Sequence, residues 1–295
     1  METNTLNAFL AVAESGSFSA AAQQLHLSQP AVSKRVAALE EELKSRLFDR
    51  LGRRVRLTEA GRQLLPRARQ LRLDIADIRR DISNLSGRAS GTLTMGTSHH
   101  IGLRRLPPVL KRYSLRHPGV TLDIRFMDSE AVCGAVEQGE LELGVVTLPT
   151  HTPESLQALA VWDDPLRFVV AEDHPLAGDH APGLEELMAH QAVLTTRGTY
   201  TREILDRALE RRGLQARPAM ATNYLETLKM MVEIGLGWGV LPLTLLDKKG
   251  MRRLRFEGLR LTRTLGIVTH RRRTLSNAAV AMRDTCLEFA SPPQR

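Results

Sequence analysis

The 295-residue chain has little of what a secreted or membrane protein needs. Cysteine occurs twice, at Cys133 and Cys286, far apart in the sequence, which argues against a disulfide scaffold and fits a reducing compartment. No apolar run approaches the roughly 18 residues that cross a bilayer, and residues 1–10 lack the basic start of a signal peptide. We therefore expect a cytoplasmic protein with no membrane partner.

Motifs typical of common enzymes are also missing. The chain contains no GxSxG nucleophile elbow, no phosphate-binding loop and no recognisable pair of catalytic carboxylates. The run 235–239 (GLGWG) resembles a dinucleotide loop only superficially, because its glycines end a predicted helix instead of opening one. His99 and His100 have no third metal ligand at a recognisable spacing. We expect no catalytic activity, no metal and no cofactor.

What is present is a helix-turn-helix pattern between Phe18 and Arg50. Small residues at 20–22 form a short helix, and Ser28 is a good N-cap for the next one. Pro30 falls in the first turn of that second helix, where its missing N–H costs nothing. Apolar residues then recur at spacings of four, three and four, at Val32, Val36, Leu39 and Leu43. The opposite, polar face can enter the DNA major groove.

The flanking segments complete a winged helix-turn-helix. Apolar residues within 6–13 predict a first helix that covers the other two. Residues 49–57 (DRLGRRVRL) predict a β-hairpin with Arg53 and Arg54 at its tip. Between Lys44 and Arg72 there are ten cations against two acids, an excess equal to the +8 of the whole chain. A basic block beside a helix-turn-helix favours phosphate contacts over a merely solvated face.

A heptad stripe follows, in a helix expected from Thr58 to about Ser86. Its apolar positions alternate between spacings of four and three: Leu64, Ala68, Leu71, Ile75, Ile78, Ile82 and Leu85. This spacing is typical of a coiled-coil seam and predicts dimerisation, although the stripe could instead pack on its own domain. A dimer would hold two recognition helices about 34 Å apart, or a multiple of this distance.

After a break at 87–91 the pattern changes to alternating strands and helices, which indicates parallel sheets built from βαβ units. We expect an α+β protein: a winged helix-turn-helix (1–58), a linker helix (59–87) and an α/β region (88–295). That region divides into two α/β subdomains, 88–161 with 270–295 and 162–269. Strands crossing near Val161 and Thr269 join them, and a small ligand fits the cleft between them.

Ordered motifs along the whole chain resemble the LysR-type transcriptional regulators. In the N-terminal part they are 9–13 (FLAVA), 16–22 (GSFSAAA), 27–33 (LSQPAVS), 47–50 (LFDR) and 57–61 (LTEAG). In the second part they include 117–118 (HP), 173–176 (DHPL) and 235–242 (GLGWGVLP). The resemblance implies a dimerising linker helix, an effector domain of periplasmic-binding-protein type, tetramers and a small-molecule inducer. Lys44 and Met127 depart from it, each standing where many members have glycine.

The polar face of the second helix supplies the candidate DNA contacts. Gln29 can pair with adenine and Arg35 with guanine, while the Pro30 ring can touch a thymine methyl. Arg35 could instead touch phosphate. The full set of candidates is Ser28, Gln29, Pro30, Ser33, Lys34, Arg35, Arg50, Arg53 and Arg54.

Hydroxyl and amide side chains that follow predicted strands supply the candidate effector contacts. Open α/β sheets bind ligands past the carboxyl ends of their strands, although each hydroxyl could simply cap a helix. The candidates are Thr97, Ser98, His99, Ser129, Thr147, Thr196, Arg197, Thr199 and Asn223. The cations Arg197, Arg202 and His99 favour an anionic ligand. A redox switch between the two cysteines is disfavoured, because Cys133 lies in an apolar helix.

The sequence thus predicts a sequence-specific transcription regulator whose cleft ligand changes how its dimers sit on operator DNA, with RNA polymerase as a further partner. The rival is a solute-binding protein or enzyme built on the same α/β halves. Activation versus repression and the identity of the effector stay open.

Overall fold

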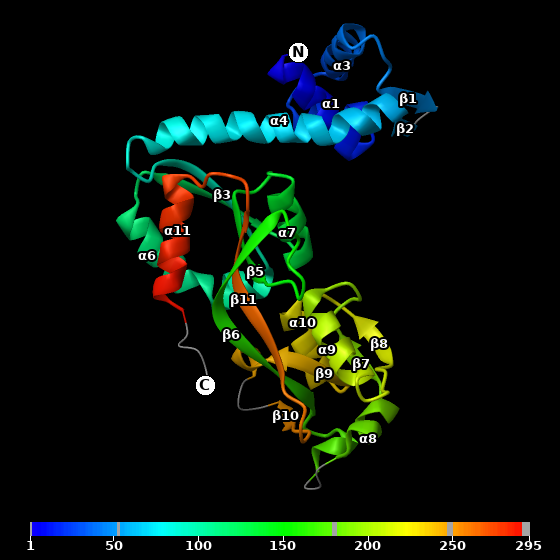
Figure 1. Ribbon diagram of the computed structural model, residues 1–295. Coiled ribbons are helices and arrows are strands. Elements are labelled where there is room, and N and C mark those ends of the chain that lie inside the picture. The colour runs from blue at the N-terminus through cyan, green and yellow to red at the C-terminus, as the bar shows by residue number, and fades with distance from the viewer. Residues whose placement is uncertain (1, 52–53, 179–181, 247–249, 291–295) are drawn as a thin grey trace. The chain divides into compact units, whose positions relative to one another are not determined.

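The computed structural model describes residues 2–51, 54–178, 182–246 and 250–290 of the chain, with the side chains of Arg50, Leu51 and Arg54 left out. The chain forms two compact units, 1–86 and 87–295 (Figure 1). The wing-tip residue Arg53 lies outside the described residues. Among the helices described, none combines the length and the apolar character needed to span a membrane.

Three helices form the core of the first unit, α1 (Thr3–Ser15), α2 (Phe18–Gln24) and α3 (Gln29–Glu42). The predicted cap of α3 is confirmed, because the Ser28 hydroxyl accepts a hydrogen bond from Ala31 N at 3.3 Å. The predicted inner face of α3 is buried at Val32, Val36 and Leu39, whereas Leu43 is 40% exposed. Burial of such apolar side chains contributes about 1.5–3 kcal/mol each.

Two non-glycine residues adopt left-handed backbone angles in the first unit, His26 with φ 53° and Lys44 with φ 49°. Each follows the end of a helix. After α3, Lys44 N bonds to Glu41 O and Ser45 N bonds to Glu40 O, the paired bonds of a Schellman cap. Lys44 therefore occupies the position for which glycine is best suited, since a side chain there costs about 1 kcal/mol.

The wing is a two-stranded antiparallel hairpin, β1 (Phe48–Leu51) and β2 (Arg54–Leu57). A carboxylate ties it to α3, since Glu40 Oε1 accepts hydrogen bonds from Leu47 N at 2.7 Å and Phe48 N at 3.2 Å. The Phe48 ring packs 5.4 Å from the ring of Phe9. The helix-turn-helix and its wing therefore share one core.

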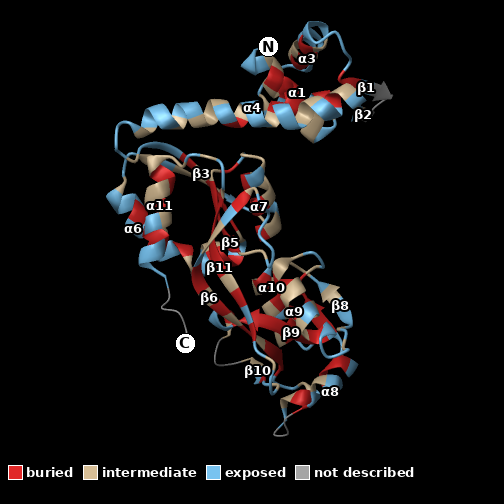
Figure 2. Ribbon diagram, in the orientation of Figure 1, coloured by how far each residue is buried: buried red, intermediate tan, exposed pale blue. Residues whose placement is uncertain are grey.

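The heptad stripe lies on α4 (Glu59–Asn84), which continues through Pro66. Leu64 and Ala68 pack into the core of the first unit, so the early part of the stripe serves its own domain. Of the later members, Ile75 is half-buried, whereas Leu71 is 36%, Ile78 59%, Ile82 66% and the C-cap residue Leu85 85% exposed. Figure 2 shows α4 as a mixture of exposed and half-buried residues over most of its length. The later part of the stripe is therefore not covered by the first unit.

The second unit is built on a nine-stranded sheet in the order β4-β3-β5-β11-β6-β9-β7-β8, with β10 also paired to β6. Half I contains the parallel strands β3 (Gly91–Thr97), β4 (Val120–Phe126) and β5 (Leu143–Thr147). Its helices are α5 (His99–Arg104), α6 (Leu106–Arg116), α7 (Ser129–Glu137) and α11 (Asn277–Glu288).

Half II contains the parallel strands β7 (Ala192–Leu194), β8 (Pro218–Ala221) and β9 (Trp238–Pro242). The remaining elements of this half are α8 (Leu184–Ala189), α9 (Tyr200–Glu210), α10 (Leu225–Glu233), the short helices η1 (Pro175–Ala177) and η2 (Leu243–Leu245), and β10 (Met251–Leu254). Figure 2 shows the central strands as largely buried, and every residue of β5 and β9 is buried.

Two long antiparallel strands, β6 (Leu156–Ala171) and β11 (Leu261–His270), run through both halves. The register between the two strands shifts between Leu265 and Gly266, opposite residues 160–162, close to the expected crossing at Val161. The other expected boundary, Thr269, is too late, because residues 265–269 already pair with β5 of half I. Glycine is required at the crossing, since a Cβ on Gly266 would lie 2.2 Å from Leu159 O.

Candidate functional site

The polar face of α3 is accessible in the first unit. Ser28, Gln29, Pro30 and Lys34 are exposed, whereas Ser33 and Arg35 are half-buried. Gln29 Nε2 donates a hydrogen bond to Ser33 Oγ at 3.2 Å, one turn further along the helix. These side chains form a continuous surface of hydrogen-bonding groups at the amino end of the helix, where a recognition helix contacts base edges.

The basic block around this helix is partly neutralised within the unit. Arg62 pairs with Glu59 at 2.8 Å, and Arg69 pairs with Glu14 at 3.4 Å. Arg72 also lies 3.9 Å from Glu14. Among the cations whose side chains the structure describes, Arg62, Arg69 and Arg72 therefore lie beside acids, and the positive charge available to DNA phosphates is smaller than the count of residues suggests.

A cavity of about 50 Å³ lies between the halves of the second unit. Residues from half I and half II line it together: Ser98, His99, His100, Asp128, Ser129, Glu130, Thr147, Thr195, Thr199, Thr201, Asn223, Tyr224, Leu225 and Arg263. Most of these side chains carry a hydrogen-bonding group, and several follow the carboxyl ends of parallel strands, where such folds bind ligands.

Direct contacts join the two halves across this cavity. Asn223 Nδ2 donates a hydrogen bond to Asp128 Oδ2 at 2.7 Å, and Tyr200 N donates one to Glu130 Oε1. The His99 ring lies 5.0 Å from the Tyr224 ring. Burial raises the pKa of Glu130. A ligand entering the cavity must compete with these contacts.

Six of the nine expected effector residues line this cavity: Ser98, His99, Ser129, Thr147, Thr199 and Asn223. Ser129 Oγ already accepts a hydrogen bond from Thr147 N at 3.1 Å. The two residues therefore fix the ends of their neighbouring elements while facing the cavity. Their position agrees with the strand-end argument, which places polar side chains of successive strands at one edge.

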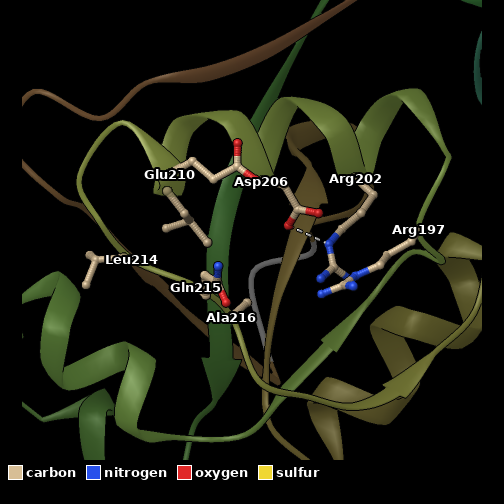
Figure 3. Close-up of a pocket in the computed structure, with 8 residues that line it drawn as sticks. Arg197, Arg202, Asp206, Glu210, Leu214, Gln215 and Ala216 are labelled. Atoms are coloured by element: carbon tan, nitrogen blue, oxygen red, sulfur yellow. Dashed lines mark hydrogen bonds and ion pairs between the residues drawn. The ribbon is translucent and has the colours of Figure 1, made fainter.

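The other three expected residues lie elsewhere. Thr97 is fully buried, and its hydroxyl donates to Val145 O at 2.8 Å. Thr196 uses its N–H and hydroxyl on Asn223 Oδ1, at 3.1 and 2.7 Å. Arg197 lines a separate pocket of about 360 Å³ beside Arg202 and Asp206 (Figure 3). Neighbouring residues at a strand end point in different directions. Sequence position alone therefore predicts more cavity-lining residues than the structure places there.

Several residues that line the cavity are not among the predicted effector contacts. Asp128 and Glu130 flank the predicted Ser129 and could have been found from the same strand end. Arg263 could not, because it comes from β11, far along the chain and inside a strand. It reaches the cavity only because β11 crosses between the halves.

Arg263 belongs to a buried ion network at the crossing. Its Nε donates to Asp164 Oδ2 at 2.8 Å and its Nη1 to Thr201 Oγ1 at 3.0 Å. Arg105 Nη2 lies 3.3 Å from Asp164 Oδ1 on the other side of the carboxylate. Asp164 is 0% exposed. Burial, followed by the charge of Arg263, lowers the pKa of the neighbouring His100 to about 3.

The cysteines and histidines show no sign of redox or metal chemistry in the part of the chain that is described. Cys133 and Cys286 are buried free thiols in different cores, and burial raises their pKa values to about 11 and 12. No cluster of three or more metal-ligating side chains occurs among the described residues.

Comparison with known proteins connects both sites to one family. Residues 3–62 match the bacterial regulatory helix-turn-helix protein, lysR family, and residues 86–291 match the LysR substrate binding domain. The chain belongs to the LysR family. It is a LysR-type DNA-binding transcription regulator with an effector-binding domain, so the expected fold class is confirmed.

Individual relatives support the LysR assignment. The RuBisCO operon transcriptional regulator of Allochromatium vinosum is 32% identical over 290 residues, which cover 97% of this chain and 95% of the relative. An uncharacterised HTH-type transcriptional regulator of Azotobacter vinelandii is 66% identical over 108 residues, 37% of this chain and 75% of that protein. Full-length OxyR of Pseudomonas aeruginosa has the same fold, with a TM-score of 0.69 at 23% identity over 99% of both chains.

Proposed function

We propose that the protein is a sequence-specific regulator that reads an operator with α3 and responds to a small ligand in the cavity between halves I and II. The observation that carries the proposal is the exposed polar surface at the start of α3, on which Gln29 and Ser33 stand one turn apart. A surface of this kind suits base edges in the major groove. The basic wing, with Arg50, Arg53 and Arg54, supplies phosphate or minor-groove contacts.

We assign one role to each of the expected domains. Residues 1–58 bind DNA, 59–87 associate with a second chain, and 88–295 bind the effector. The apolar exposure of Ile78, Ile82 and Leu85 supports self-association through α4, because a paired helix would cover these side chains. A dimer, or a tetramer built from two dimers, would place two recognition helices on one face of the operator. RNA polymerase is the further partner, and the site of action is the cytoplasm.

Ligand control works through the contacts that join the two halves across the cavity. The bonds from Asn223 to Asp128 and from Tyr200 to Glu130 join the halves directly. A ligand that replaces these bonds with its own contacts changes the balance between open and closed arrangements by its differential affinity for the two. This shift between open and closed arrangements regulates transcription when the dimers bound to DNA differ in stability between the two arrangements. We assign no catalytic role to the cavity.

The test is selection of DNA from a random pool by the full-length protein, followed by a salt titration with the selected and a scrambled duplex. We expect a preference for the selected duplex of about 10³-fold or more and a steep fall of both affinities with salt. Absence of DNA binding would instead favour a solute-binding protein or an enzyme.

Self-association has its own test. We expect Ile82→Asp to shift the protein toward monomers in analytical ultracentrifugation, because the substitution puts a charge into the proposed seam. Ser83→Asp is the matched control, since Ser83 is exposed at the neighbouring position outside the stripe. If both variants self-associate as strongly as the wild type does, α4 is not the association surface.

A further inference from the structure

Arg263 lines the cavity, and one of its guanidinium nitrogens has no hydrogen-bond partner among the described residues. Arg263 is 4% exposed, and its Nε and Nη1 are hydrogen-bonded to Asp164 and Thr201. Its Nη2 is buried without a hydrogen-bond partner among the described residues. A buried donor left unmatched is costly, and a guanidinium that lines a ligand cavity is well shaped to bind a carboxylate.

The charge around Arg263 explains which nitrogen is left for a ligand. Asp164 lies between two arginines, Arg105 and Arg263. One carboxylate therefore serves two guanidinium groups, and Arg263 retains a charged donor, Nη2, without a partner among the described residues. His100, which also lines the cavity, stays neutral near pH 7 because its pKa is about 3. The Arg263 end of the cavity is consequently suited to a negative group.

Other walls of the same cavity are acidic. Asp128 and Glu130 both line it, and each has one oxygen engaged by an N–H from half II. A simple anion would meet these carboxylates as well as Arg263. A ligand that carries hydrogen-bond donors or a positive charge at its other end would match both walls.

We propose that the cavity binds a small amino acid, with its carboxylate on Arg263 Nη2 and its ammonium group toward Asp128 and Glu130. The cavity, of about 50 Å³, favours a small ligand. This inference rests on the proposed effector role of the cavity and narrows the ligand from an anion to a zwitterion. Arg263 thereby becomes the residue that recognises the carboxylate.

The experiment is a thermal-shift and calorimetric titration of the full-length protein with glycine, L-alanine, L-serine and L-cysteine at one ionic strength. Acetate and methylamine, each carrying half of glycine, serve as comparison ligands. We expect at least one amino acid to raise the melting temperature, because a ligand of the folded state stabilises it by mass action. Acetate and methylamine should bind at least tenfold more weakly.

Two matched substitutions locate the site. Arg263→Lys keeps a cation beside Asp164 but removes the planar guanidinium group and with it the nitrogen that has no partner. The affinity for the amino acid should therefore fall at least tenfold. Arg105→Lys makes the same change on the other side of Asp164, outside the cavity lining, and affinity should stay within about threefold of the wild type. Circular dichroism checks that both variants fold.

Three results would overturn the inference: no response to any of the four amino acids, acetate as effective as the best amino acid, or equal losses in both lysine variants. The operator titration separates this failure from failure of the proposed function. A wild-type protein that binds its selected duplex specifically, yet ignores amino acids, retains the regulatory role and loses only the ligand assignment.

Discussion

The α3 surface and the cavity present polar side chains in opposite ways. At the start of α3 most of them are exposed, although Ser33 and Arg35 are half-buried, and Gln29 bonds only to its helical neighbour Ser33 in the part of the chain that is described. In the cavity the exposed Asp128 and His99 stand beside buried groups such as Ser129 and Arg263, and some bonds join the two halves, as that from Asn223 to Asp128 does. A surface of the first kind can meet DNA without rearranging. In the proposed function a ligand of the cavity exchanges internal bonds for its own, and this exchange would give the ligand control.

The largest expected effect comes from breaking the buried network next to the cavity. Asp164→Ala leaves Arg105 and Arg263 without their shared carboxylate. Removing one partner of a buried ion pair costs about 3–5 kcal/mol, so urea unfolding of the second unit should shift strongly. DNA contacts on α3 are not touched by this change.

Asp163→Ala is the matched control, because Asp163 is the neighbouring, only partly buried acid. Its unfolding free energy should stay close to that of the wild type. If both alanine variants unfold at the same urea concentration as the wild type, the network does not stabilise the crossing of the halves.

The next effect concerns the exposed surface. Arg35→Ala should weaken binding to the selected duplex by about 1–3 kcal/mol if Arg35 reads a guanine. Lys34→Ala should weaken binding to every sequence alike and reduce the salt slope by about 1, because a lysine on phosphate acts without regard to sequence. Fluorescence anisotropy with selected and scrambled duplexes distinguishes the two. A uniform loss in Arg35→Ala would make Arg35 a phosphate contact.

A smaller effect depends on pH and again belongs to the cavity. His100 has a folded pKa of about 3, whereas an unfolded histidine titrates near 6.5. Between these values the unfolded chain binds a proton that the folded chain does not, so the free energy of unfolding falls as the pH decreases. At pH 5 the loss is at most about 2 kcal/mol.

Urea unfolding at pH 7 and pH 5 measures this loss, with His100→Asn as the comparison. The variant should lose less stability than the wild type between the two pH values. An identical decrease in both proteins would mean that His100 carries none of the acid sensitivity.

The smallest effect concerns Lys44, which follows the carboxyl end of α3. Lys44→Gly should raise the stability of the first unit by up to about 1 kcal/mol, because glycine adopts the left-handed angle of this C-cap without a Cβ clash. Lys44→Ala loses the same charge but keeps the clash, so it should bring no gain. Equal stability of the two variants in urea would show that the cap is not strained.

The two regions also differ in how well sequence reasoning anticipates them. The α3 surface is local, so a cap at Ser28, a proline in the first turn and one apolar stripe suffice to place Gln29 and Arg35 on it. The cavity combines residues from distant elements. Strand ends predict Ser98, Ser129 and Asn223, but nothing near Arg263 in the sequence indicates that a strand residue will reach the ligand site. Side-chain direction at strand ends, which decides the fate of Thr97, is likewise a tertiary property.

The most direct test of the account is the ratio of affinities for selected and scrambled DNA, measured by anisotropy for the wild type and Gln29→Ala across a salt series. Gln157→Ala, an exposed glutamine in the second unit, serves as control. We predict that Gln29→Ala lowers the ratio by at least tenfold while the salt slope stays unchanged, because a base contact is lost and phosphate contacts remain. An unchanged ratio in Gln29→Ala would contradict the claim that α3 reads the operator through this face.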